Sequence, residues 1–77
     1  NADLARVLYE RAADAGLAAA QLSLAMLYEA GMNWPQDLPR AVRWYRAAAA
    51  QGSPEAMLNL GYLYAAGRGV PADPVEA

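Results

Sequence analysis

The fold is decided by the stretch Leu58-Asn59-Leu60-Gly61-Tyr62-Leu63-Tyr64-Ala65-Ala66-Gly67-Arg68-Gly69-Val70, because residues 22–34 follow the same plan. Tyr28 and Tyr64 are 36 residues apart in the sequence, and so are Gly31 and Gly67. The same spacing, without a gap, separates three further pairs: Gly16 and Gly52, Tyr9 and Tyr45, Asp37 and Asp73. A fixed period in this range is typical of stacked repeats. We therefore divide the chain into unit 1 (1–36), unit 2 (37–72) and the start of a truncated third unit (73–77).

Each unit is predicted to hold two helices, since its apolar residues recur at helical spacing. The first helices are expected at about 3–15 and 38–50, where the apolar stripes are Ala5, Leu8, Tyr9, Ala12 and Ala13, then Ala41, Trp44, Tyr45, Ala48 and Ala49. The stripes of the second helices are Ala20, Leu24, Leu27 and Tyr28, then Ala56, Leu60, Leu63 and Tyr64. The fold class that follows is an all-α solenoid of antiparallel helix hairpins with a 36-residue period.

Helix ends are marked by residues with known capping roles. Asn1, Asp37 and Asp73 can each accept from the free amides of a first helical turn, and Ser53 can do the same. The glycines at 16, 31, 52 and 67 stop the helices, because glycine adopts the left-handed conformation that often closes one. Gly61 and its counterpart Ala25 are predicted to let the two helices of a hairpin approach closely. Trp34 is predicted to pack over the hairpin below it.

Composition excludes several classes of function. The chain has 77 residues, a formal charge of −2, and no cysteine or histidine, so the usual zinc sites and disulfide frameworks cannot be built. The charge gives no basic excess for nucleic acid, and no apolar run approaches the ~20 residues that span a bilayer. We expect no metal, no cofactor, no nucleic-acid partner and no membrane insertion. The chain holds no targeting segment, so its compartment is left open.

The repeat also resembles a known family, on the strength of the segment 41–52, then Ala56, then 60–70, then Asp73. This pattern is similar to the Sel1-like repeats, relatives of the tetratricopeptide repeats. Unit 1 departs from the pattern at Leu8, at Ala25 and at Asn33-Trp34. The resemblance implies a right-handed superhelix, a bacterial protein, and a role as an adaptor that holds protein complexes together. It implies no enzymatic activity, and the serine β-lactamase motifs are missing here.

The first helices of successive solenoid units usually line the concave surface, so that face is the candidate binding site. Its candidate partner-binding residues are Arg6, Val7, Glu10, Val42, Arg43 and Arg46. They could seat a peptide, with arginine gripping carboxylates. Alternatively they form a solvated face with ion pairs between units, such as Glu10 with Arg46, each worth under about 1 kcal/mol.

Aromatic residues on the stripes are predicted to be core, with Tyr62 as the exposed exception. Two functions remain open from the sequence. The first is a non-catalytic adaptor that binds a protein or peptide on the concave face. The alternative is a structural segment that stacks end to end with further repeats or identical chains, because both ends carry apolar stripes without a polar cap. An enzyme is not expected, since the chain offers no thiol, imidazole or lysine as nucleophile or base.

Overall fold

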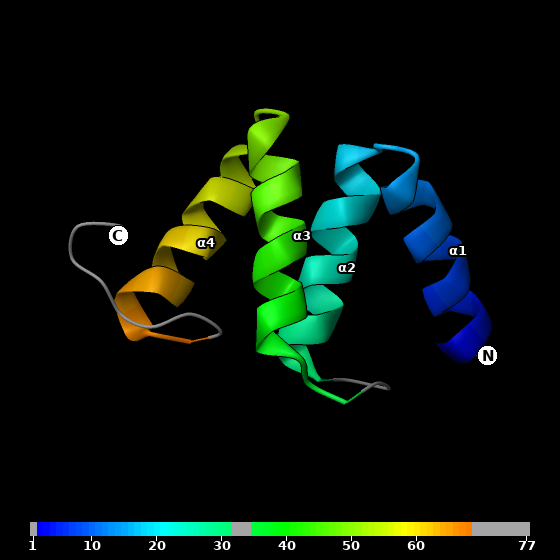
Figure 1. Cartoon of the computed structure of the whole chain (residues 1–77), viewed down its shortest axis with the longest axis horizontal. Helices are drawn as coiled ribbons and strands as arrows, with labels where there is room; N and C mark the ends of the chain where they lie inside the picture. Colours follow the sequence, from blue (N-terminus) through cyan, green and yellow to red (C-terminus); the bar gives the residue numbers. More distant parts are fainter. Residues whose placement is uncertain (1, 32–34, 69–77) are drawn as a thin grey trace.

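The structure, a computed structural model, describes residues 2–31 and 35–68, with side chains from residue 4 onward. These residues form four α-helices of similar length: α1 (Ala2–Asp14), α2 (Ala18–Ala30), α3 (Leu38–Ala50) and α4 (Pro54–Ala66). Each helix packs on its neighbours in chain order, and successive helices run antiparallel (Figure 1). The prediction of an all-α fold of antiparallel hairpins is confirmed. The handedness of the superhelix stays a prediction.

The helix ends follow the capping chemistry expected from the sequence. Asp37 Oδ1 accepts a hydrogen bond from the Arg40 amide at 3.0 Å, and Ser53 Oγ accepts one from the Ala56 amide at 3.2 Å. The four predicted stop glycines, at 16, 31, 52 and 67, all have positive φ. The predicted caps Asn1 and Asp73, the third unit, and Trp34 lie outside the described residues.

The core is centred on α2 and α3, because each of these helices has a neighbour on both sides. α2 lies between α1 and α3, and α3 lies between α2 and α4 (Figure 1). Tyr45, Ala41 and Ala48 on α3 are therefore fully buried. Among the four described helices α1 packs against α2 alone, and its Tyr9, the counterpart of Tyr45, stays 39% exposed. The burial of a position thus depends on where its unit stands in the stack.

Polar side chains link the two units across the contact between α2 and α3. The Tyr45 hydroxyl donates to Glu29 Oε1 at 2.6 Å. Gln51 Nε2 donates to Gln21 Oε1 at 2.9 Å and to the Gly16 carbonyl at 2.8 Å. Gln21 is itself buried and donates to the Ala13 carbonyl at 3.0 Å. Within the part of the chain that the structure describes, no buried side-chain nitrogen or oxygen lacks a partner.

These contacts predict a pH dependence of stability that belongs to Tyr45. Burial, and then the neighbouring Glu29 carboxylate, raise the pKa of Tyr45 above its ordinary value. The unfolded chain therefore loses this proton near pH 10 while the folded chain keeps it. The stability that Tyr45 contributes is complete below that pH and is lost as the pH rises toward the folded pKa. The expected loss is about 1.4 kcal/mol per pH unit.

Urea unfolding of the wild type and of Tyr45→Phe between pH 8 and 11 measures this effect. The free-energy difference between the two proteins should be constant below about pH 10 and shrink above it. The other four tyrosines are common to both proteins and cancel in the comparison. A difference that stays constant up to pH 11 would contradict the prediction.

Gly61 does not have the role that the sequence predicted for it. A Cβ built there would meet no atom within 4 Å, so the hairpin partner α3 does not require a glycine. Its counterpart Ala25 is fully buried. Ala25 lies on α2, which packs against α3 of the following unit, whereas no described unit follows Gly61. The small residue at this position therefore serves the contact between units.

Candidate functional site

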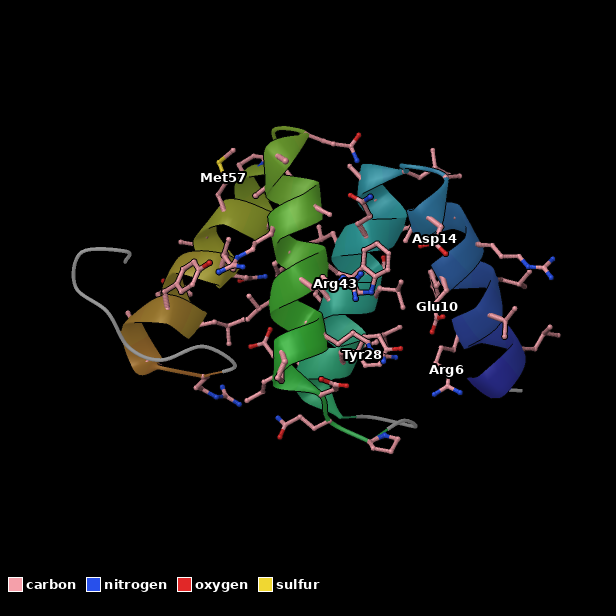
Figure 2. The ribbon with its side chains drawn as sticks, viewed as in Figure 1. Arg6, Glu10, Asp14, Tyr28, Arg43 and Met57 are labelled. Atoms are coloured by element: carbon pink, nitrogen blue, oxygen red, sulfur yellow. The ribbon has the colours of Figure 1, made fainter. Side chains whose placement is uncertain are left out.

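A groove lies between α1 and α3, the first helices of the two units. It is lined by five residues, Glu10 and Asp14 from α1 and Arg40, Arg43 and Trp44 from α3, and has a volume of about 190 Å³. We call it the first-helix groove. Glu10, Asp14 and Arg43 project toward the space between the two helices (Figure 2). The groove therefore has an acidic wall and a basic wall, with an indole ring on the basic side.

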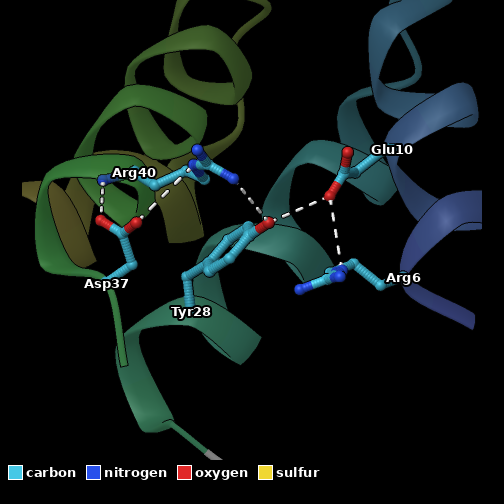
Figure 3. A network of polar contacts seen from close by, with 5 residues as sticks. All are labelled: Arg6, Glu10, Tyr28, Asp37 and Arg40. Carbon is cyan, nitrogen blue, oxygen red and sulfur yellow. Dashed lines mark hydrogen bonds and ion pairs between the residues drawn. The ribbon is translucent and has the colours of Figure 1, made fainter. Parts of the chain in front are cut away.

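Tyr28 on α2 connects the two walls (Figure 3). Its hydroxyl donates to Glu10 Oε1 at 3.0 Å and accepts from Arg40 Nη1 at 3.3 Å. Glu10 Oε1 also lies 3.9 Å from Arg6 Nε, and Arg40 Nε lies 3.7 Å from Asp37 Oδ2. The result is a chain of polar contacts from α1 to the start of α3.

Because Tyr28 is buried, it gives this network a fixed anchor. The Arg40 guanidinium also stacks on the Tyr28 ring, 5.4 Å from its centre. The hydrogen bond to Tyr28, and then the nearby charges, raise the pKa of Arg40 above its ordinary value. Arg40 thus keeps its charge and a restricted geometry at the mouth of the groove.

The same arrangement recurs one unit later with a different charge. Arg46 Nε donates to the Tyr64 hydroxyl, and the guanidinium lies 5.3 Å from the centre of the Tyr64 ring. Arg46 and Tyr64 are 36 residues beyond Glu10 and Tyr28. The ion pair predicted between Glu10 and Arg46 is wrong, since each residue binds the tyrosine of its own unit instead.

Two charged residues of the groove are not used in the fold. Asp14 and Arg43 are both exposed and face the groove from opposite walls. Within residues 4–31 and 35–68, neither side chain has an ion pair or hydrogen bond. Their charges are therefore available to a ligand without breaking a contact that holds the helices.

The structure separates the six residues predicted from the sequence. Glu10 and Arg43 line the first-helix groove, and Arg6 supports the Glu10 carboxylate. Val7 is exposed, at 44%, but is not part of the groove lining. Arg46 lies on unit 2 against Tyr64.

The placement of Val42 on this surface is wrong, because Val42 is only 2% exposed and belongs to the core. The stripe of α3 is wider than that of α1 because α3 is covered from two sides.

Three residues that line the groove are not among the six predicted from the sequence. Asp14 follows Glu10 by one helical turn, and Arg40 precedes Arg43 by nearly one, so helical spacing could have found both. The apolar stripe predicts Trp44 in the core, but its side chain is only half-buried and lines the groove.

The aromatic residues divide by their place in the stack. Tyr28 and Tyr45 are core residues as predicted. The core prediction is wrong for Tyr9, which is exposed, and only partly right for Tyr64, which is half-buried. Tyr62 is exposed, as expected.

Two classes of site find no support in the described part of the chain. Residues 4–31 and 35–68 contain no group of three or more acidic, histidine or cysteine side chains that could hold a metal ion. Among the four described helices, none has the length and apolar character needed to cross a bilayer.

Comparison with known proteins identifies the repeat. The family model described as Sel1 repeat matches residues 1–17, 18–53 and 54–77. The second and third matches begin at Ala18 and Pro54, the first residues of α2 and α4. The unit boundaries at 36/37 and 72/73 stay a prediction. No curated protein is similar enough to the chain to count as a match.

Two solved structures are similar over most of the chain. One is a Sel1 repeat protein from Oxalobacter formigenes, with 38% identity and a TM-score of 0.88, covering 95% of this chain and 30% of that one. The other is c5321, a protective antigen present in uropathogenic Escherichia coli strains and displaying an SLR fold. It has 43% identity and a TM-score of 0.83, covering 88% of this chain and 15% of that one. This chain thus spans less than a third of either protein.

Proposed function

This chain belongs to the Sel1 repeat family, and on that premise we propose that it is a non-catalytic protein–protein interaction module. Its binding surface is the first-helix groove. The occupant is a peptide segment of another protein, in extended or helical form, that carries both an acidic and a basic side chain.

The observation that carries this proposal is the pair of unused charges, Asp14 and Arg43, on opposite walls. Arg43 can grip a carboxylate of the peptide with its planar guanidinium, and Asp14 can pair with a basic side chain. Trp44 offers the apolar surface beside them. Charges fixed at two points select the direction and register of a peptide, which gives specificity more than affinity.

The chemistry of the chain favours binding over catalysis. It has no thiol or imidazole, and no lysine occurs among its six basic residues. Of its two serines, Ser53 is occupied as the cap of α4, where it accepts from Ala56. No activated nucleophile with an adjacent base can be assembled from these groups.

A library of short peptides with one acid and one base at varied spacing tests the proposal. Peptides selected on the wild type should bind Arg43→Glu at least ~10-fold more weakly, because reversal replaces an attraction with a repulsion. Fluorescence anisotropy gives the affinities. The double variant Asp14→Arg/Arg43→Asp should prefer the same peptides with acid and base exchanged.

Arg11→Glu is the matched control, since Arg11 is exposed on α1 and does not line the groove. It makes the same charge change and should leave peptide affinity within about twofold. Equal losses of peptide affinity in Arg11→Glu and Arg43→Glu would mean that the effect comes from the net charge of the protein and not from the groove. Unchanged binding in Arg43→Glu would remove the groove as the binding surface.

The second candidate function is structural: the module stacks end to end with copies of itself. The observation that favours it is the apolar surface left uncovered on the two outer helices, which includes Leu8 and Tyr9 on α1 and Met57 and Leu58 on α4.

A further inference from the structure

An apolar groove lies on the outer flank of the α1–α2 hairpin, on the side away from α3. It has a volume of about 670 Å³ and is lined by Ala5, Leu8, Tyr9, Ala12, Leu17, Ala18, Ala19, Ala20 and Ser23. We call it the head groove. It is several times larger than the first-helix groove and contains no charged side chain.

The internal repeat indicates what shape of occupant the head groove fits. Adding 36 to the numbers of its α1 residues Ala5, Leu8, Tyr9 and Ala12 gives Ala41, Trp44, Tyr45 and Ala48 on α3, the helix that packs against α2. Tyr9 is 39% exposed and Ala5 is exposed, whereas their counterparts Tyr45 and Ala41 are fully buried. α2 provides the cover in unit 2. No described helix covers the head groove, which has the shape of the same docking surface and therefore fits a helix of the α2 type.

α4 is such a helix, and no described helix covers its corresponding flank. Leu58 and Met57 are more than half exposed, and the space beside Gly61 is open. The counterpart of Met57 is Gln21, which is buried between the units, and the counterpart of Gly61 is Ala25, which is fully buried. We call the flank formed by Met57, Leu58 and Gly61 the tail face.

One exchanged pair makes the tail face of this chain suit its own head groove. In the contact between units, Gln51 donates to Gln21. The counterpart of Gln51 is Ala15, in the turn after α1 and outside the head groove lining, and the counterpart of Gln21 on the tail face is Met57. A polar pair inside the molecule thus corresponds to an apolar pair between molecules. An unpaired glutamine on either side would oppose burial, and neither surface has one.

From these correspondences we infer that the head groove of one molecule binds the tail face of a second copy in the register of the internal repeat. The inference rests on the second candidate function and specifies its surfaces. Head and tail are different patches, so each added copy leaves one free head and one free tail. Such a contact builds an open chain of molecules instead of a closed dimer.

Light scattering across a concentration series up to about 1 mM tests the inference on the 77-residue chain. The wild type should rise from the monomer mass of 8.2 kDa past twice that value without a plateau. Gly61→Arg blocks the tail and Ala5→Arg blocks the head, and each should remain at the monomer mass. Arginine forms helix better than glycine, and both sites are exposed, so circular dichroism should show the helices intact.

Mixing the two blocked variants provides the sharpest result. Ala5→Arg still has a free tail and Gly61→Arg still has a free head, so an equimolar mixture should form one 1:1 heterodimer and stop there. Ala50→Arg is the control: Ala50 is exposed, as is its counterpart Asp14, so it lies outside the contact between units and should associate like the wild type. Met57→Arg is a second tail variant should Gly61→Arg fold poorly.

Each other outcome overturns the inference. A monomer throughout the series removes both the second candidate function and the head-to-tail contact. Association that persists in Ala5→Arg and Gly61→Arg keeps self-association but rejects these surfaces. A mixture that stays monomeric, or grows beyond two, rejects the head-to-tail register.

Discussion

Val42→Asp is expected to unfold the protein. Val42 is 2% exposed, and every buried polar side-chain atom in the described part of the chain already has a hydrogen-bond partner, so the new carboxylate would be buried without one. Such a change costs several kcal/mol, against a total stability of roughly 4–12 kcal/mol for a chain of this length. Circular dichroism at room temperature should show the loss of most of the helical signal.

Val7→Asp is the matched control, since it makes the same substitution on the other first helix. Val7 is largely exposed, and its replacement should change the unfolding free energy by only about 0.5 kcal/mol. Comparing the two variants also shows whether position 42 serves folding or binding, because the sequence predicts Val42 on the binding face. If the Val42→Asp protein remained folded, the burial of Val42 in the core would be contradicted.

Leu24→Ala has the second-largest expected effect. Leu24 is fully buried in the core and belongs to α2, the helix that packs between α1 and α3. Removing three carbons from such a site costs about 2–5 kcal/mol, because the cavity collapses only in part. Urea unfolding should show a midpoint shifted strongly downward.

The repeat supplies a control for this variant as well. Leu60 occupies the same position in unit 2 but is only half-buried, since no described helix covers the far side of α4. Leu60→Ala should therefore lose clearly less stability than Leu24→Ala. Equal losses would mean that burial at this position does not depend on the following unit.

The helices could be predicted from the sequence because their signals are local. Periodic apolar residues, stop glycines and the cap Asp37 placed α1 and α3 to within a residue. The stop glycines Gly31 and Gly67 and the cap Ser53 marked ends of α2 and α4. These signals act within one turn and do not depend on neighbours. The width of the buried stripe does depend on neighbours, so the same pattern gave a core residue at Tyr45 and an exposed one at Tyr9.

The first-helix groove was predicted only in outline, for the same physical reason. The first helices do form its walls, and Glu10 and Arg43 line it; their role in binding stays a prediction. The ion pair between Glu10 and Arg46 was wrong because a charged side chain bonds to the nearest fixed partner, and that partner comes from another helix of its own unit. Sequence spacing on one helix does not reveal it.

The tyrosine of the second helix in each unit holds a charged residue of the first helix, and the sign of that charge differs between the two units. A phenol hydroxyl can donate a hydrogen bond to a carboxylate, as Tyr28 does to Glu10, or accept one from a guanidinium, as Tyr64 does from Arg46. Replacing acid by base at this position therefore requires no other change in the scaffold. A stack of such units could carry an ordered row of acidic and basic side chains along one face. The order of these charges would then select the partner, while the helices that carry them stayed the same.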